Sequence, residues 1–523
     1  MIRRLPIGIQ DFGKLRDEGH VYVDKTAIIY DFISKSSGAY FFARPRRFGK
    51  SLLCSTLRAI FQGRRELFQE IKGYPALVID SLDWEWKKYP VILLNMNAGD
   101  YTQGEAGMRT SVSFLLGEIA KTESIELRGE NISDQFKALI IDLHKKYNER
   151  VVVIIDEYDK PLLDTIDDKE THEKYRKILK SFYGILKASD EYLKLTFITG
   201  VTKFSQVSIF SDLNHLADIS FDKKYSILCG LTQEEVEQNF EPEIISVLEN
   251  EELTREDYFE KLRLFYNGYR FTEKDQKVFN PFGLLQHFLS EGKFLSYWFD
   301  SGSSSFLVKL VKDSKINILD LQKMRIDYDS FKRFDIDNLE TLPILYQSGY
   351  LTIVDYDKKY NEFVLDYPNL EVRSAFSKVL LTLINPNSYD ITVLKQISGT
   401  LNRGEIDKTL TIIKQFLANT PYDLVKNTEN YYHTAIHLIF SMLGLDCRSE
   451  VRIAAGRIDT VVKTDTHIYC FEFKLDKPAK EALAQIDTKE YMLPYENEGK
   501  ILVKIGVSFS SEKRNIDDWE LRI

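Results

Sequence analysis

Residues 43–51 read Ala43-Arg44-Pro45-Arg46-Arg47-Phe48-Gly49-Lys50-Ser51, and they end in the Gly-Lys-Ser of a phosphate-binding loop. A second stretch, Val151-Val152-Val153-Ile154-Ile155-Asp156-Glu157, reads as a buried apolar strand that ends in two acids. A nucleoside triphosphate with its magnesium ion needs both of these features. The two stretches together therefore predict a P-loop nucleotide site on a parallel α/β sheet.

The residues of this site have distinct expected roles. Backbone N–H groups of the loop and the Lys50 ammonium surround the phosphates, and the Ser51 hydroxyl takes one magnesium position. Asp156 is expected to hold that ion from the neighbouring strand, and Glu157 to orient the attacking water. The loop departs from the usual G-x-x-x-x-G-K-S/T pattern because Arg44 replaces the first glycine. The nucleotide-binding residues expected here are Arg46, Arg47, Phe48, Gly49, Lys50, Ser51, Leu52, Asp156 and Thr199.

The composition indicates a folded protein of several domains. The chain has 523 residues, of which 44% are hydrophobic and 28% charged, and this length predicts about three or four domains. No apolar run reaches the ~18 residues of a membrane span, and the N-terminus lacks the apolar core of a secretory signal. Neither the four cysteines nor the eight histidines have metal-ligand spacing. We therefore expect a cytoplasmic protein with reduced thiols and no membrane contact.

The net charge of -9 limits the kind of nucleic-acid contact that is expected. An acidic chain is not attracted to phosphate backbones as a dedicated DNA-binding domain is. This charge argues against abundant non-specific binding, but it does not exclude an enzyme that uses magnesium on nucleic acid.

The hydrophobic pattern divides the chain into four expected domains. Residues 1–225 alternate strands and helices, which predicts a P-loop core with a parallel sheet covered by helices on both faces. Residues 226–325 read as helical and are placed as a lid over bound nucleotide. Residues 326–420 are interpreted as a winged-helix-like unit with a helical connector, and residues 421–523 as a C-terminal α/β domain.

Strands in the core are expected at residues 40–43, 91–95, 151–155 and 195–200, and a helix at 51–61. The order of loop strand, acidic strand and a later strand ending in threonine is that of P-loop ATPases. Thr199 or Thr202 would then lie beside the γ-phosphate as a sensor, whereas a threonine that ends a strand is more often structural.

The middle of the chain carries weaker signals. Thr232 is expected to cap a helix, and Arg270 either reaches the phosphates or, more commonly for an arginine among aromatic residues, stacks or forms an ion pair. A helix at 336–346 should precede a hairpin with strands at 350–354 and 362–365. A further helix is expected at residues 371–381. The few basic residues here favour packing between domains over DNA binding.

A second group of charged residues lies near the C-terminus. Glu472 and Lys474 are expected on one face of a strand, while Phe471 and Phe473 pack on the other. Asp459, expected at the end of the neighbouring strand, completes a carboxylate pair that can hold magnesium and leave positions for water. A bound ion there can generate hydroxide and stabilise a phosphodiester transition state. The alternative interpretation is an ordinary amphipathic strand with a solvated Glu472 and Lys474.

Supporting residues lie on the flanking helices. Glu429 opens a helix and can supply a third acid, and Gln485 lies on the helix after the strand. The metal ligands expected from the sequence are Ser51, Asp156, Glu429, Asp459 and Glu472. The expected catalytic residues are Glu157, Asp459, Glu472, Lys474 and Gln485.

Together these motifs resemble those of the bacterial AAA-ATPase-like proteins that end in a PD-(D/E)XK nuclease-superfamily domain. The resemblance covers nearly the whole chain, and the loop at residues 44–51 looks like that family's own variant, in which Arg44 is no objection. The matching motifs lie at residues 5–12, 22–26, 44–51, 156–161, 266–271, 280–282, 297–299 with Gly302, 456–459 and 472–474.

The resemblance implies an α/β multidomain protein that uses ATP and Mg2+. Its parts would be an AAA-like P-loop NTPase core, a helical lid, a winged-helix-like unit and a restriction-endonuclease-like C-terminal domain. Arg46 and Arg47 would contact phosphate in their own subunit, act as arginine fingers in a homo-oligomer, or pair with surface acids. The residues it assigns to the two sites are Lys50, Ser51, Asp156 and Glu157, and Asp459, Glu472 and Lys474, with Glu429 and Gln485 in support.

The leading hypothesis from the sequence is an ATP-binding and ATP-hydrolysing protein that controls a magnesium-dependent nuclease. Its substrate would be nucleic acid, with DNA preferred over RNA. The alternative is an ATP-dependent switch or scaffold whose nuclease-like domain is catalytically inactive and only binds nucleic acid or a protein partner. A transporter or kinase-like P-loop enzyme is disfavoured because the sequence has neither a membrane span nor an acceptor motif.

Overall fold

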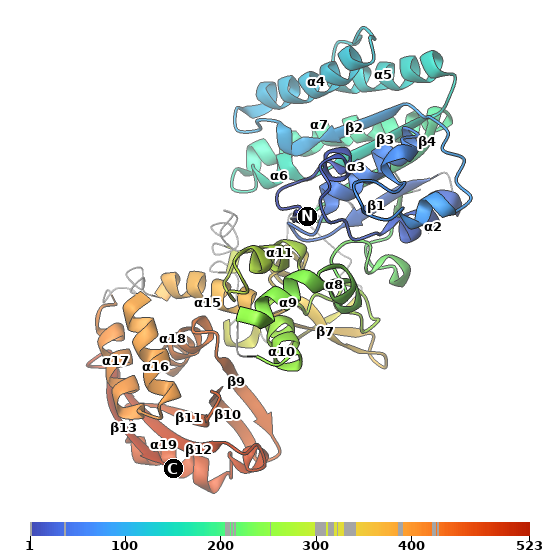
Figure 1. Ribbon diagram of the computed structural model, residues 1–523. Helices are drawn as coiled ribbons and strands as arrows, with labels where there is room; N and C mark the ends of the chain where they lie inside the picture. Colours follow the sequence, from blue (N-terminus) through green and yellow to red (C-terminus); the bar gives the residue numbers. More distant parts are fainter. Residues whose placement is uncertain are drawn as a thin grey trace. The chain divides into compact units, whose positions relative to one another are not determined.

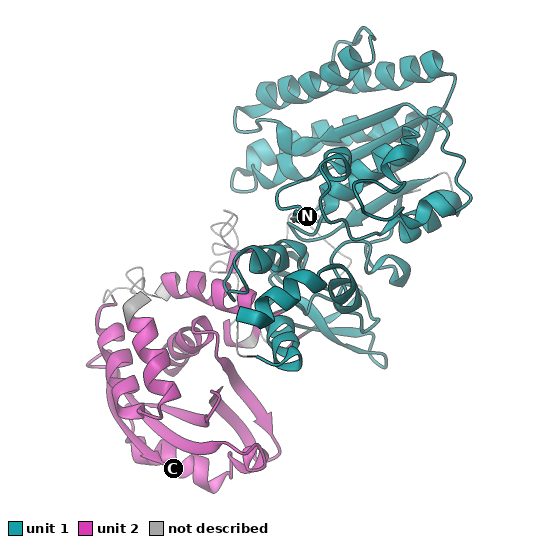
Figure 2. Ribbon diagram, viewed as in Figure 1, with its two compact units in different colours: residues 1–297, 325–368 teal, residues 298–324, 369–523 magenta. Residues whose placement is uncertain are grey.

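The structure of the protein is a computed structural model, and it divides into two compact units (Figure 2). Unit 1 comprises residues 1–297 and 325–368, and unit 2 comprises residues 298–324 and 369–523. The chain therefore passes between the units three times, at 297/298, 324/325 and 368/369, and the last passage divides the expected third domain. The residues described are 3–35, 38–203, 210, 213, 216–250, 253–298, 310–311, 318–321, 323–328, 341–384, 391–420, 425 and 428–523.

The nucleotide-binding half of unit 1 is built on a five-stranded parallel sheet with strand order β2-β3-β4-β1-β5. All six residues of β3 are buried, as expected for a parallel strand that is covered on both faces. The strands are β1 (Ala39–Ala43), β2 (Val91–Asn95), β3 (Val151–Asp156), β4 (Leu193–Gly200) and β5 (Leu216–Asp218). The expected parallel α/β core is therefore confirmed.

One expectation about this sheet is wrong. Strand β3, which ends at Asp156, is not the neighbour of the loop strand β1, because β4 lies between them. The two functional segments still meet, since the carboxyl ends of parallel strands lie along one edge of the sheet. The order of strands along the chain does not specify their order in the sheet.

Helices cover both faces of this sheet. Figure 1 shows α4, α5 and α7 on one side and α3 on the other. Side chains of α4, α5 and α7 share a core cluster with Ile92, Val153 and Ile155 of the strands. The helices are α1 (Phe12–Asp17), α2 (Thr26–Lys35), α3 (Lys50–Phe61), α4 (Gly104–Thr122), α5 (Ile132–Tyr147), α6 (Lys160–Leu163) and α7 (Lys169–Ala188).

The rest of unit 1 is a helical segment followed by a small sheet. Thr232 caps α8 in a capping box with Glu235, which confirms the expected helix start. The hairpin of β7 and β8 is also confirmed, and β6 adds a third strand in the order β6-β8-β7. Of the helix expected at 336–346, residues 336–340 lie outside the described residues. The elements are α8 (Gln233–Asn239), α9 (Glu241–Asn250), α10 (Arg255–Tyr266), α11 (Pro281–Leu289), β6 (Met324–Asp327), α14 (Thr341–Gln347), β7 (Thr352–Asp357) and β8 (Glu362–Asp366).

Unit 2 contains a five-stranded mixed sheet with strand order β13-β12-β11-β10-β9 (Figure 1). Strands β9, β10 and β11 are antiparallel, whereas β11 and β12 are parallel and are joined through α19. Helix α18 packs on β9, β10 and β11. The strands are β9 (Asp446–Ile453), β10 (Gly456–Lys463), β11 (His467–Leu475), β12 (Ile501–Ser510) and β13 (Asn515–Arg522). The helices are α15 (Leu370–Ile384), α16 (Ile391–Asn402), α17 (Ile406–Ala418), α18 (Glu429–Met442) and α19 (Ala479–Thr488).

The structure also describes the state of the cysteines and the character of the helices. All four cysteines are buried free thiols. Among the described helices, none has both the length and the apolar character needed to cross a membrane.

Candidate nucleotide and metal sites

The loop after β1 contains two residues in the left-handed backbone conformation. Arg47 has φ 66° and Gly49 has φ 92°, a left-handed conformation that favours glycine at position 49. Gly49 is the N-cap of α3, so the first N–H groups of that helix are presented at the loop. Lys50 is buried, and its Nζ donates to the carbonyl oxygens of Arg44 at 3.0 Å and Pro45 at 3.1 Å. The loop therefore holds the Lys50 ammonium against two of its own carbonyl oxygens.

Asp156 provides the acidic half of this site. The residue is 2% exposed, and its carboxyl hydrogen-bonds with the side chain of Ser51. Burial raises the pKa of Asp156, although Ser51 and Lys50 oppose the rise. Its Oδ1 has no hydrogen-bond partner, which is unusual for a buried carboxylate oxygen. A magnesium ion beside the Ser51 hydroxyl would satisfy this oxygen, so the residues fit the expected ion.

Glu157 follows directly in a left-handed conformation with φ 51°. Burial raises the pKa of Glu157, and attraction to Lys50 and Arg46 opposes the rise. The structure thus brings Lys50, Ser51, Asp156 and Glu157 together, as the sequence predicts. Leu52 lies in the first turn of α3.

Arg44 has a structural position that explains why the first glycine of the loop is replaceable. Its guanidinium donates to the carbonyl oxygens of Ala43 at 2.8 Å and Ser220 at 2.9 Å. It also lies over the rings of Phe42 and Phe271, at 4.3 and 4.1 Å from their centroids. Burial lowers the pKa of Arg44 to about 10. The side chain stabilises the base of the loop.

The next loop residues contact the helical segment of the same unit. The Arg47 guanidinium lies 3.8 Å from the ring centroid of Phe282 and donates to the Tyr297 carbonyl oxygen at 3.1 Å. Phe48 is buried and packs edge-on against Tyr269, with 4.8 Å between ring centroids. Arg47 therefore also contacts the helical segment, which the sequence did not predict.

The two strand-ending threonines have structural contacts. Thr199 is fully buried and its hydroxyl donates to the Phe42 carbonyl oxygen at 2.7 Å. The Thr202 hydroxyl donates to Asp159 Oδ2 at 2.7 Å, and the Thr202 amide donates to the same oxygen at 2.7 Å. These bonds join β4 to β1, and the segment after β4 to the segment after β3, which favours the structural alternative over the sensor role.

The contacts of Arg270 favour the ion-pair alternative, because its guanidinium lies 3.4 Å from Asp275 Oδ1. The guanidinium is buried and donates to the carbonyl oxygens of Thr272 at 3.0 Å and Glu273 at 2.5 Å. These bonds hold the turn that follows α10 and direct the side chain toward its own loop.

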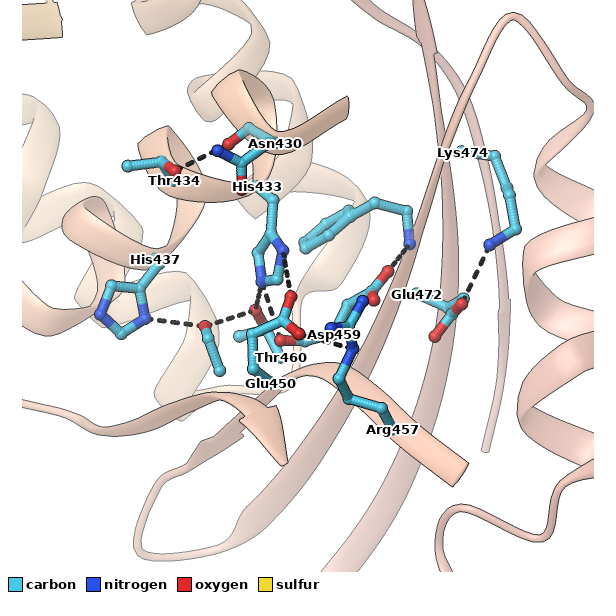
Figure 3. Close-up of polar contacts among 12 residues, drawn as sticks. Asn430, His433, Thr434, His437, Glu450, Arg457, Asp459, Thr460, Glu472 and Lys474 are labelled. Atoms are coloured by element: carbon cyan, nitrogen blue, oxygen red, sulfur yellow. Dashed lines mark hydrogen bonds and ion pairs between the residues drawn. The ribbon is translucent and has the colours of Figure 1, made fainter. Parts of the chain in front are cut away.

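In unit 2, Glu472 and Lys474 share one face of β11, as the alternation of a strand predicts (Figure 3). Lys474 Nζ donates to Glu472 Oε1 at 3.0 Å, and Gln485 Nε2 from α19 donates to the same oxygen. Glu472 is 1% exposed, and its Oε2 has no hydrogen-bond partner. Burial, together with repulsion from Asp459, raises the pKa of Glu472 to about 7. These observations exclude the alternative of a solvated amphipathic strand.

Asp459 lies within β10 and not at its end, which corrects the expected position. The pairing of β10 with β11 extends from Lys463–Ile468 to Thr460–Phe471. Asp459 is the next residue of β10 beyond this paired stretch. Asp459 Oδ2 there accepts a hydrogen bond from the Phe473 amide at 2.8 Å. Burial raises the pKa of Asp459. Two neighbouring carboxyls that resist ionisation fit a divalent cation, which would remove their repulsion.

Glu429 lies at the start of α18 and accepts a hydrogen bond from the Leu475 amide at 3.2 Å through Oε2. Its charge acts on Glu472 and Lys474. Lys474 has a raised pKa because its hydrogen bond and attraction to Glu472 outweigh the opposing effect of burial. The structure therefore groups all five residues that the sequence assigned to this site.

The sequence missed two further residues of this region. His433 of α18 and Glu450 of β9 lie with Asp459 so that one ligand atom of each falls within 4.8 Å of the others (Figure 3). Burial lowers the pKa of His433 to about 4. Spacing along the chain gave no signal, because the three residues come from three different elements.

Family models of known proteins match an N-terminal and a C-terminal part of the chain. Residues 6–210 match a family described as a predicted AAA-ATPase, and residues 427–519 match the PD-(D/E)XK nuclease superfamily. The "Uncharacterized protein in vnfD 5'region" of Azotobacter chroococcum mcd 1 is 34% identical over 525 residues, covering 98% of each chain. The chain belongs to this family of AAA-ATPase-like proteins with a PD-(D/E)XK domain.

The two sites lie inside the matched ranges. Lys50 and Asp156 fall in the AAA-ATPase-like domain, and Asp459 and Glu472 fall in the PD-(D/E)XK domain. The chain thus carries an ATPase-like domain and a nuclease-superfamily domain, which generally use nucleotide and divalent metal.

Proposed function

We propose that this protein is a divalent-cation-dependent nuclease, acting on DNA in preference to RNA, whose activity is controlled by ATP bound in the other unit. The observation that carries the proposal is the buried carboxyl of Glu472. Its Oε1 is held by Lys474 and Gln485, while Oε2 is buried without a hydrogen-bond partner. A buried polar atom left in this state costs about 1–3 kcal/mol, which a ligand at that atom would recover.

The residues of this site have distinct proposed roles. Lys474 and Gln485 fix the orientation of the Glu472 carboxyl, and the Phe473 amide fixes that of Asp459 through Oδ2. One oxygen of each acid is thus occupied and the other remains for the ion. A magnesium ion held there would activate a water and stabilise charge on the phosphodiester. The Lys474 ammonium is close enough to Glu472 to neutralise negative charge that develops beside it.

In the nucleotide site, Lys50 and the N–H groups at the start of α3 would bind phosphate, and Ser51 with Asp156 would hold the magnesium ion. Lys50 would exchange its contacts with the loop carbonyls for contacts with phosphate. Glu157 would orient the attacking water. Hydrolysis would then change the contacts of a loop that also carries Arg47 and Phe48, which pack on the helical segment.

The covalent path between the units supports the proposed control. Because the chain passes between the units three times, a conformational change in unit 1 would be transmitted through several covalent connections to unit 2. We also propose that residues 326–420 include a winged-helix-like unit, which packs between domains and does not bind DNA.

The test is cleavage of plasmid and single-stranded DNA by the full-length protein with Mg2+ or Mn2+, with and without ATP. Asp459→Asn and Glu472→Gln should abolish cleavage and leave ATP binding unchanged. The matched control is Asp465→Asn, an exposed carboxylate in the turn between β10 and β11, which should cut normally. Lys50→Ala should remove the effect of ATP.

Two outcomes would overturn the proposal. Cleavage that persists in both carboxylate variants would refute the site. Absence of any cleavage by a wild-type protein that binds ATP would support the switch or scaffold, with a nuclease-like domain that is catalytically inactive and only binds its partner.

A further inference from the structure

His433, Glu450 and Asp459 form a cluster beside the carboxylate pair of the nuclease-like site (Figure 3). His433 projects from α18 and is 4% exposed. Glu450 and Asp459 lie on adjacent strands, between the cross-strand pairs Thr460–Ser449 and Ile458–Val451. The His433 Nδ1 atom is 3.4 Å from Glu450 Oε1. The cluster thus brings one imidazole to two carboxylates.

Hydrogen bonds determine which nitrogen of His433 carries the proton. Nε2 lies 2.8 Å from the backbone carbonyl oxygen of Asp459 and 2.9 Å from the Thr460 hydroxyl. A carbonyl oxygen only accepts, so Nε2 must carry a hydrogen. In the neutral imidazole Nδ1 then has a lone pair, and this lone pair faces a carboxylate oxygen. Two acceptors at this distance need a cation or a second proton between them.

The surrounding residues hold the ring in this orientation. The Thr460 hydroxyl lies 2.9 Å from Ser449 Oγ, which lies 2.8 Å from Nδ1 of the buried His437. The ring of Phe473 packs against His433 at 5.1 Å between centroids. An imidazole whose N–H is bound to a backbone carbonyl, with the other nitrogen presented to acids, has the typical environment of a metal ligand.

The position of the Glu450 carboxylate beside His433 is fixed by a contact with Arg457. Its backbone has φ 56°, a left-handed conformation that costs about 1–2 kcal/mol for a residue with a side chain. Arg457 Nε binds Glu450 Oε2 at 2.5 Å, so that Oε1 is the oxygen that faces His433. The arginine contact at Oε2 thus accompanies the approach of Oε1 to the imidazole.

We propose that His433 Nδ1, Glu450 and Asp459 form a second cation site, selective for a transition-metal ion such as Mn2+ or Zn2+, which shares Asp459 with the magnesium site. An imidazole nitrogen favours these ions, whereas Mg2+ prefers an all-oxygen set such as that of Asp459 with Glu472. Three protein ligands leave at least one position open for water. The proposal concerns metal binding and stands independently of nuclease activity.

The test is electron spin-echo spectroscopy of Mn2+ bound to the full-length, metal-stripped protein, with excess Mg2+ present to occupy the all-oxygen site. The wild type should show modulation from a 14N nucleus, because an imidazole nitrogen is coordinated. His433→Gln should lose this modulation and bind Mn2+ at least about tenfold more weakly, a loss of ~1.4 kcal/mol. Glu472→Gln should retain the modulation.

A matched control is His467→Gln, which alters a histidine of the same domain whose ring bonds Thr466. This variant should keep both the modulation and the Mn2+ affinity. Hydrogen-exchange protection of β10 and β11 in His433→Gln will show that the domain remains folded. Bound Mn2+ without 14N modulation in the wild type, or modulation that survives His433→Gln, would overturn the proposal. Absence of Mn2+ binding would also overturn it. A proton, and not a metal ion, would then lie between His433 Nδ1 and Glu450 Oε1.

Discussion

In the metal-free protein, the difference in the free energy of unfolding of unit 2 between Glu472→Gln and the wild type should depend on pH. The variant should gain stability relative to the wild type between pH 4.5 and pH 8. The pKa of Glu472 is raised from 4.5 to about 7 by burial and by repulsion from Asp459. Between these values the folded state binds more protons than the unfolded state, so the stability of the wild type falls as pH rises. Glutamine stays neutral and lacks this loss.

The magnitude follows from the two pKa values. At about 1.4 kcal/mol per pKa unit, the change from 4.5 to about 7 corresponds to about 3 kcal/mol, nearly all of it developed by pH 8. The side chain is 2% exposed, so solvent screening does not reduce this value much. Contacts with Lys474 and Gln485 that glutamine alters equally at both pH values cancel in the comparison.

The assay is urea unfolding of the full chain in chelator, followed by pulsed hydrogen exchange on peptides from β10, β11 and α19. The free energy of unfolding of wild type and Glu472→Gln is compared at pH 4.5 and pH 8. Glu481→Gln, which alters an exposed carboxylate on α19, is the matched control and should give no pH-dependent difference. A difference between wild type and Glu472→Gln that does not change with pH would refute the reasoning.

Four further results are expected. Lys50→Ala should weaken ATP binding at least about tenfold in calorimetry, because a buried cation that faces the phosphates is lost; unchanged affinity would contradict the loop assignment. Gly49→Ala should destabilise unit 1 by about 1–2 kcal/mol in urea unfolding through its φ of 92° alone, because no atom lies within 4 Å of the added Cβ. Thr232→Val should cost about 1 kcal/mol through loss of the capping box with Glu235, and Thr232→Ser should restore most of it. Mg2+ affinity of the PD-(D/E)XK domain should fall as pH falls below about 7, since protons compete for Glu472, and a flat profile from pH 6 to 8 would contradict this.

Local sequence determined the elements and most of the chemistry. The apolar run at 151–155 predicted a fully buried strand, and residues 151–156 form one. The period of two in β11 placed Glu472 and Lys474 on the same face, and their hydrogen bond confirms it. The Thr232 cap and the hairpin at 352–366 followed from capping and turn chemistry in the same way. These features depend on residues close in sequence, so their physical causes are visible in one stretch of chain.

Only the tertiary structure decided what distant segments do to one another. The insertion of β4 between β1 and β3 depends on how crossover connections pack, which no single segment encodes. The guanidinium groups of Arg44 and Arg270 are bound by carbonyl groups of folded loops, which their local sequences did not predict. His433, Glu450 and Asp459 come together because α18, β9 and β10 pack against one another. The burial that raises the pKa of Glu472 is likewise a property of the assembled domain, because the residues that exclude water come from several elements.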